Sequence, residues 1–198
     1  MIRNELVNPS KNDNFSPVCM RLYLTKIIKE NQITFVDLEE IGTSEDTLFN
    51  LQYIIHINKA VYYNTEFYHY IRNNYNSVTR SKGMELFYKY KNLNKRLMQE
   101  VKKNGLNNQE FLLALENRKA ISAITLGLNI EKSKDNLKEK LRNLDIILKD
   151  EEIRNALKEI NTNYMAVHWK VFFKLCKNKR KILVLSLLKI MNIIILKK

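Results

Sequence analysis

The stretch MELFYKYKNLNKRLMQEVKKNG, residues 84–105, decides the fold of the second half of this chain. Five of its side chains recur at three- and four-residue intervals and form one stripe: Leu86, Tyr90, Leu93, Leu97 and Val101. This is the spacing of one face of an α-helix. The Asn–Gly pair at residues 104–105 is typical of a helix end. The stretch therefore predicts a long amphipathic helix.

The residues that follow continue the helical pattern. Apolar side chains predict a second helix over roughly 108–126, a third over roughly 134–148 and a fourth over roughly 151–160. No internal repeat is detectable. We therefore expect an all-helical region over residues 83–168.

The composition of the 198-residue chain agrees with a folded, mainly helical protein. An apolar fraction of 45% and a charged fraction of 28% are those of a globular protein. Only four Gly and two Pro are present, which argues against an all-β fold with its many turns. Two cysteines, Cys19 and Cys176, make neither a disulfide framework nor a four-ligand zinc site. With no signal peptide, a reducing cytoplasmic setting is the default expectation.

The first 82 residues have a mixed pattern. Helices are predicted within residues 18–31 and from about residue 44, where Thr43 or Ser44 is a good N-cap. Residues 32–37, 60–63 and 66–71 are rich in β-branched and aromatic side chains and predict short strands. The expected fold class is an α/β region over residues 1–82 followed by an all-α C-terminal region, predominantly helical overall.

Most of the excess positive charge lies at the end of the chain. The net charge is +13, and residues 170–198 contain nine Lys or Arg side chains and no acid. Removing these nine leaves +4 for residues 1–169. We treat 169–198 as a basic apolar tail.

The tail has two interpretations. Its apolar run, residues 182–196, would form a helix of about 22 Å, short of the roughly 30 Å hydrocarbon core of a bilayer. The tail fits a helix lying in an anionic membrane surface. The alternative is a C-terminal helix docked on the protein's own core. The side chains assigned to the membrane surface are Trp169, Phe172, Phe173, Lys179, Arg180 and Lys181.

An acid pair, Glu45 and Asp46, opens the helix predicted near residue 44. Acids in a first turn commonly do no more than complement the helix dipole. The functional alternative is a carboxylate, held ionised by helix N-terminal amides, that takes a proton from a hydroxyl nucleophile.

A second candidate feature is EFYHYIRNNYNSVTRS, residues 66–81. His69 lies in its predicted strand, where a lone histidine is more often structural than catalytic. Arg72 and Arg80 follow it, and arginines near a histidine suit an anionic diphosphate. No glycine-rich phosphate loop and no D-x-D pair occur in the sequence.

Together, the run from NQITF through EEIGTSEDTLFN and YHYIR to NSVTRS resembles the C-terminal part of the catalytic domain of family 2 glycosyltransferases. These GT-A enzymes use nucleotide sugars to build bacterial surface polysaccharides. The resemblance covers about residues 15–82. The basic helical remainder is similar to the C-terminal tails of such enzymes.

The resemblance implies a role for each candidate residue. Asp46, with Glu45 as its neighbour, would be the base that deprotonates the acceptor hydroxyl, and the reaction would invert the anomeric centre. His69 would be a ligand of a divalent cation, Mn or Mg, or of the diphosphate. Arg72 and Arg80 would hold the diphosphate leaving group. The implied partners are a nucleotide-sugar donor and a saccharide or lipid-linked acceptor.

The sequence also departs from the family pattern. Such enzymes begin with a nucleotide-binding half that carries a D-x-D, and Cys19 stands where many relatives carry a tryptophan. We therefore expect a C-terminal portion, from a truncated or split gene or a misassigned start, that is inactive alone. Its expected location is cytoplasmic, peripheral on the inner face of the membrane, with no nucleic-acid partner.

Two other functions stay open. One is a non-catalytic basic helical module that binds membranes or nucleic acid. The other is a non-catalytic remnant or partner subunit that completes a separately encoded nucleotide-binding half.

Overall fold

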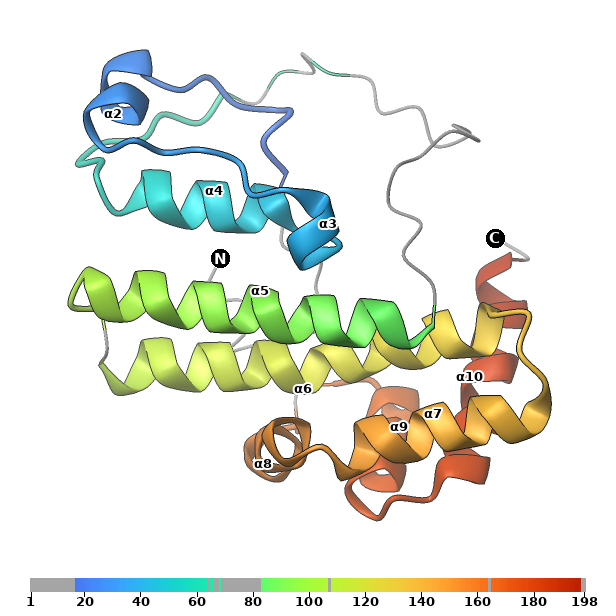
Figure 1. Cartoon of the computed structure of the whole chain (residues 1–198). Helices are drawn as coiled ribbons and strands as arrows, with labels where there is room; N and C mark the ends of the chain where they lie inside the picture. Colours follow the sequence, from blue (N-terminus) through green and yellow to red (C-terminus); the bar gives the residue numbers. More distant parts are fainter. Residues whose placement is uncertain are drawn as a thin grey trace. The chain divides into compact units, whose positions relative to one another are not determined.

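The computed structural model describes residues 17–63, 65, 68, 83–106, 108–163 and 165–196, with side chains up to residue 193. The described part is 70% helical and contains no strand (Figure 1). It divides into two compact units. The first contains the described residues between 17 and 68 together with 89–106. The second contains 83–88 and the described residues from 108 onward.

The first unit is built around helix α4, Glu45–Ile54. Two shorter helices precede it, α2 at Thr25–Glu30 and α3 at Leu38–Ile41. Most of α5, which runs over Met84–Lys103, also belongs to this unit. Side-chain hydrogen bonds join α5 to its neighbours. Gln52 Nε2 donates to Glu100 Oε1 over 2.9 Å, and Arg96 Nε donates to Glu40 Oε1 over 2.7 Å.

The second unit consists of helices packed on α6, Gln109–Lys132. The others are α7 at Leu137–Lys149, α8 at Glu151–Glu159, α9 at Val167–Lys177 and α10 at Lys181–Leu196. Helix α6 contacts α7, α8 and α10, and α9 contacts α8 and α10 (Figure 1). Buried apolar side chains, such as Leu126, Ile130, Leu144 and Leu157, fill the space between the helices. This burial is the main source of their stability.

Local sequence sets where these helices begin. The side chain of Asn108 accepts a hydrogen bond from Phe111 N, and that of Asn136 accepts one from Glu139 N. Each bond satisfies one of the amides left free at a helix N-terminus. The long helix predicted within residues 84–105 and those predicted over 108–126, 134–148 and 151–160 are all present, and the helix predicted from about residue 44 begins at Glu45.

The expected α/β region is wrong, because no strand is found among the described residues. Residues 33–37 are irregular backbone, and two of their apolar side chains, Ile33 and Phe35, pack on α4 instead of lining a sheet. Ile33 is buried with Phe49 and Tyr53, and the ring of Phe35 stacks on that of Phe49 at 4.3 Å between centroids. Residues 60–63 are also irregular. A β-prone run becomes a strand only where another strand completes its hydrogen bonds. Of the run 66–71, only Tyr68 is described, without regular structure.

The tail forms two helices, α9 and α10, rather than a single segment. Helix α10 contacts α6, α7 and α9, so its inner face is docked on the second unit, as in the second interpretation of the tail. Gly127 of α6 allows this close approach. A Cβ at that position would lie 2.7 Å from Leu188 Cδ1 of α10.

Candidate functional site

The acid pair lies where the sequence predicts it, in the first turn of α4. Ser44 occupies the N-cap position with φ 65°, but its side chain makes no capping hydrogen bond. Glu45 and Asp46 are both half-buried. The amide dipoles of the first turn interact favourably with both negative charges.

Asp46 also binds the chain segment that precedes α2. Its Oδ2 accepts a hydrogen bond from the backbone N–H of Val18 over 3.2 Å. Among the described residues, no hydrogen bond or ion pair to Asp46 Oδ1 is found. One carboxylate oxygen therefore holds the segment before α2, and the other has no hydrogen-bond partner among the described residues.

Residues 18–24 are held along α4 by two further hydrogen bonds. The Tyr23 hydroxyl donates to Asn50 Oδ1 over 2.6 Å, and the Leu24 N–H donates to the Tyr53 hydroxyl over 2.8 Å. The Tyr23 ring also meets the rings of Phe49 and Tyr53 edge to face, at centroid distances of 5.4 and 4.8 Å. We call Asp46, Tyr23, Arg21, Asn50 and Tyr53 the α4 polar cluster.

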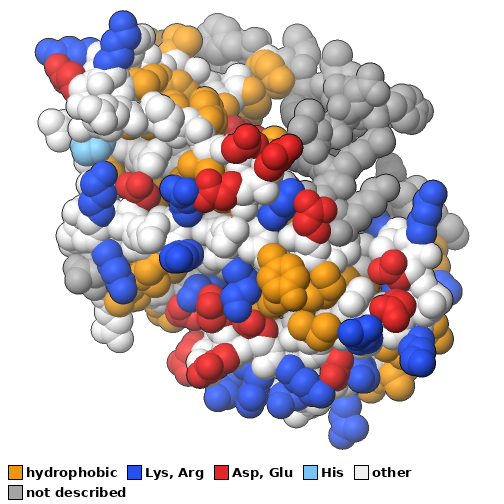
Figure 2. Space-filling view, viewed as in Figure 1, with side chains coloured by type: hydrophobic (Ala, Val, Ile, Leu, Met, Phe, Trp, Pro, Cys, Tyr) orange, Lys and Arg blue, Asp and Glu red, His pale blue; other side chains and the backbone are white. Residues whose placement is uncertain are grey.

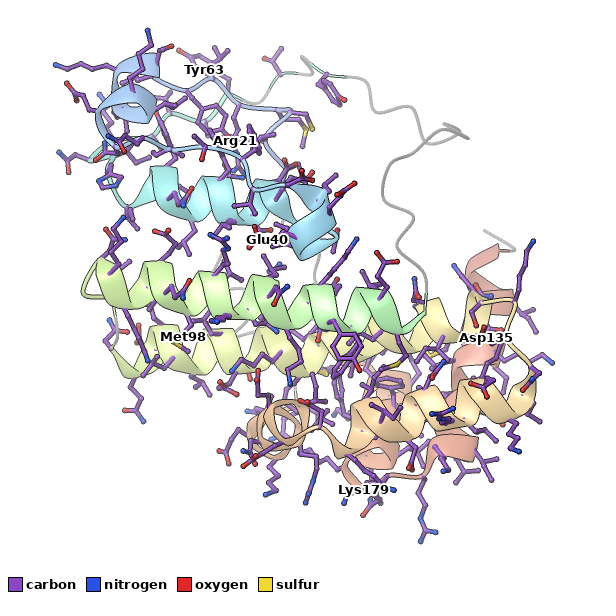
Figure 3. The ribbon with its side chains drawn as sticks, viewed as in Figure 1. Arg21, Glu40, Tyr63, Met98, Asp135 and Lys179 are labelled. Atoms are coloured by element: carbon purple, nitrogen blue, oxygen red, sulfur yellow. The ribbon has the colours of Figure 1, made fainter. Side chains whose placement is uncertain are left out.

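The charges and the burial of this cluster shift the pKa of the Tyr23 hydroxyl. Burial raises the pKa of its hydroxyl above the usual value of 10.0. The positive charge of the nearby Arg21 guanidinium opposes this rise, whereas the negative charge of Asp46 adds to it. Arg21 lies on the segment that passes over α4 (Figure 3). A cation, a carboxylate and a half-buried phenol thus lie close together on one side of α4.

Sequence reasoning found Asp46 but missed the other members of the cluster. A signal was present in VCMRLYL, residues 18–24, where polar Arg21 and Tyr23 alternate with Met20, Leu22 and Leu24. In the structure the two polar side chains are half-buried, and the three apolar ones are 58%, 101% and 68% exposed. Alternation of this kind marks a segment with one covered face.

The remaining predicted ligands lie outside the described residues. These are His69, Arg72 and Arg80, so their grouping with Asp46 stays a prediction. Within the part of the chain that the structure describes, no group of three His, Cys, Asp or Glu side chains is arranged to hold a metal ion.

The predicted membrane-surface residues divide into two groups. Lys179 and Arg180 are exposed, and Trp169 is half-buried. Lys181 is half-buried and pairs with Asp145 over 3.1 Å. Phe172 and Phe173 are only 0% and 1% exposed, so assigning them to the surface was wrong. Their rings meet edge to face and fill the core on the inner side of α9.

Comparison with known proteins identifies no similar protein. No protein-family profile, no curated protein and no solved structure matches this chain. Among the described helices, none has both the length and the apolar character needed to cross a bilayer.

Proposed function

We propose that the chain supplies the acceptor side of a glycosyltransferase similar to family 2, which transfers a sugar from a nucleotide-sugar donor to a saccharide hydroxyl. Asp46 accepts the hydroxyl proton. The freed oxygen forms a bond to the anomeric carbon of the donor, and the bond from that carbon to the phosphate oxygen breaks. The nucleoside diphosphate leaves with the bonding electrons. Glu45 is the acidic neighbour of the base.

The observation that carries this proposal is the setting of Asp46. Its Oδ2 is fixed by the Val18 N–H, and its Oδ1 has no partner among the described residues. A general base needs this combination of a fixed position and an oxygen able to take the proton. The order of EDTLFN, YHYIR and NSVTRS in the sequence supports the same assignment.

The donor side requires residues beyond the α4 polar cluster. His69, Arg72 and Arg80 are the proposed ligands of the diphosphate and of a Mn or Mg ion. Such an ion would neutralise charge on the leaving group.

The proposal also includes a donor-binding polypeptide as partner. Large apolar side chains exposed in the first unit support such a partner. They include Met20, Leu22, Leu24, Phe35, Val61, Tyr62 and Tyr63. Figure 2 shows hydrophobic side chains at the surface of this unit.

The test combines the purified chain with the polypeptide encoded directly upstream. Transfer of labelled hexose from UDP-glucose and UDP-galactose to saccharide extracted from the source cells is measured. We expect transfer by the mixture and a loss of about 10²-fold or more in turnover for Asp46→Asn, with donor binding retained. Asp37→Asn, which changes the acidic N-cap of α3, is the matched control and should transfer normally.

Asn at position 46 keeps an oxygen that accepts from Val18 N, so lost turnover would not reflect a lost contact. Equal turnover of Asp46→Asn and the unaltered chain would show that Asp46 is not the base. Absence of transfer by the unaltered mixture would overturn the proposed function.

A further inference from the structure

Helix α10 is apolar on two opposite sides. Its inner side buries Val184, Leu185, Leu188 and Met191. Its outer side exposes Ile182 by 63%, Leu183 by 53%, Ile190 by 55% and Ile193 by 48%. The outer positions are separated by 1, 7 and 3 residues, which places them on one face of the helix. A helix on the surface of a globular protein ordinarily turns polar side chains outward, so this outer face is unusual.

The outer face also carries a serine and a lysine, and two further cations lie at the start of the helix. The only other exposed side chains on α10 up to residue 193 are Ser186 and Lys189. Lys179 and Arg180 are exposed in the turn that leads into α10. Figure 3 places Lys179 at that turn, at the end of the second unit where Figure 2 shows many Lys and Arg side chains. No Asp or Glu occurs between residues 170 and 198.

The exposed side of α9 has the same composition. Val167 and Val171 are 74% and 43% exposed, and Lys170 and Lys174 next to them are also exposed. Both helices thus present branched apolar side chains beside exposed cations.

We propose that the outer face of α10, with the Lys179–Arg180 turn and the exposed side of α9, binds the surface of an anionic lipid bilayer. The apolar side chains would enter the boundary between headgroups and acyl chains, and the cations would contact lipid phosphates. The phosphates of a nucleic acid would contact the cations, but Ile182, Leu183 and Ile190 would stay exposed to water. A helix of 16 residues, about 24 Å long, lies flat in such a surface rather than crossing it. This inference is independent of the proposed sugar transfer.

Flotation of the full chain with vesicles tests the proposal. Phosphatidylcholine vesicles with and without phosphatidylglycerol are compared at low and high salt. We expect binding only with phosphatidylglycerol and weaker binding at high salt. Lys179→Gln with Arg180→Gln should lower the partition coefficient about fivefold for each cation removed. Lys102→Gln with Lys103→Gln removes the same charge from exposed positions on α5 and should have a much smaller effect.

A second variant separates apolar insertion from simple charge attraction. Ile182→Asn with Ile190→Asn changes exposed positions, so the fold should persist, as circular dichroism would show. This variant should bind more weakly at both salt concentrations. Unchanged binding by the Asn variant would mean adsorption by charge alone and would overturn the proposal. So would tight, salt-dependent binding to a labelled oligonucleotide in the absence of any vesicle binding.

Discussion

The backbone N–H of Val18 donates a hydrogen bond to Asp46 Oδ2, 28 residues further along the chain. The proposed base is thus also part of the local fold. With the bond from Leu24 N to the Tyr53 hydroxyl, it fixes both ends of residues 18–24 along α4. A substitution at Asp46 must therefore be judged for stability as well as for turnover.

We expect Asp46→Ala and Asp46→Asn to differ in stability. The Ala variant leaves the partly buried Val18 N–H without an acceptor, which should cost about 1–2 kcal/mol. The Asn variant keeps an acceptor oxygen and should lose less than half as much. Urea denaturation of the purified chain measures both. Equal losses would show that the bond to Val18 contributes nothing to the fold.

Tyr23→Phe should destabilise the chain by about 1 kcal/mol. The variant keeps the edge-to-face ring contacts and removes only the hydroxyl that donates to Asn50, whose side chain is fully buried. Tyr63→Phe removes the same atom from a side chain that is 71% exposed, and its stability should change by less than about 0.5 kcal/mol. Melting temperatures of the two variants give the comparison. A smaller shift for Tyr23→Phe than for Tyr63→Phe would contradict the assigned role.

The helices of the second half could be predicted because their apolar stripes are long and regular. Leu86, Leu93, Leu97 and Val101 are all buried, as their spacing indicates. The structure of the segments around residues 33–37 and 60–63 could not be predicted in this way. High β-propensity indicates only that a residue suits a half-buried extended chain. Whether such a segment pairs with a strand or packs on a helix depends on what lies beside it. Here Phe35 stacks on Phe49 of α4.

The candidate site could be predicted only where it depends on a local sequence pattern. A first-turn acid pair is a local pattern, so the position of Asp46 at the start of α4 followed from the sequence. The partner of Asp46 is the backbone N–H of Val18, and any residue except proline supplies such a donor, so the sequence does not reveal it.

In α9, the aromatic side chains of Phe172 and Phe173 were compatible with either a protein core or a membrane surface. Only packing against the neighbouring helices shows that they face inward.

The two cysteines should react at very different rates with a thiol reagent. Cys19 is exposed, whereas Cys176 is 1% exposed. Burial also raises the pKa of the Cys176 thiol to about 12, which keeps it protonated at pH 8. In a colorimetric thiol assay, one equivalent should react at once and the second only after denaturant is added. Rapid reaction of both thiols in the folded chain would contradict the packing of α9.

The stability of the chain should fall in acid partly through Asp145. Hydrogen bonds from Lys149 and Lys181 lower the pKa of this carboxyl below 3.8. The unfolded chain therefore takes up the proton more readily, and the contribution is lost as the pH falls through the lowered pKa. Asp145→Asn should cost up to about 1 kcal/mol at pH 7 and much less at pH 2. Melting curves of both proteins at the two pH values provide the test.

Gly127→Val should loosen the docking of α10 on α6. Leu188 is fully buried, and its Cδ1 lies 2.7 Å from where a Cβ on Gly127 would be placed. Valine at that position overfills a packed core, which should cost about 1–3 kcal/mol. Thr125→Val adds a branched apolar side chain at an exposed position of the same helix and should be nearly neutral.

A double-mutant cycle shows whether the two residues meet. Leu188→Ala alone should cost about 2–5 kcal/mol, because it leaves a cavity in the core. In the Gly127→Val background the cost should be smaller, because the valine side chain occupies part of that cavity and the overlap with Leu188 is relieved. Free energies of unfolding from urea titrations of all four proteins give the coupling. Strictly additive losses would mean that α6 and α10 are not packed through these two residues.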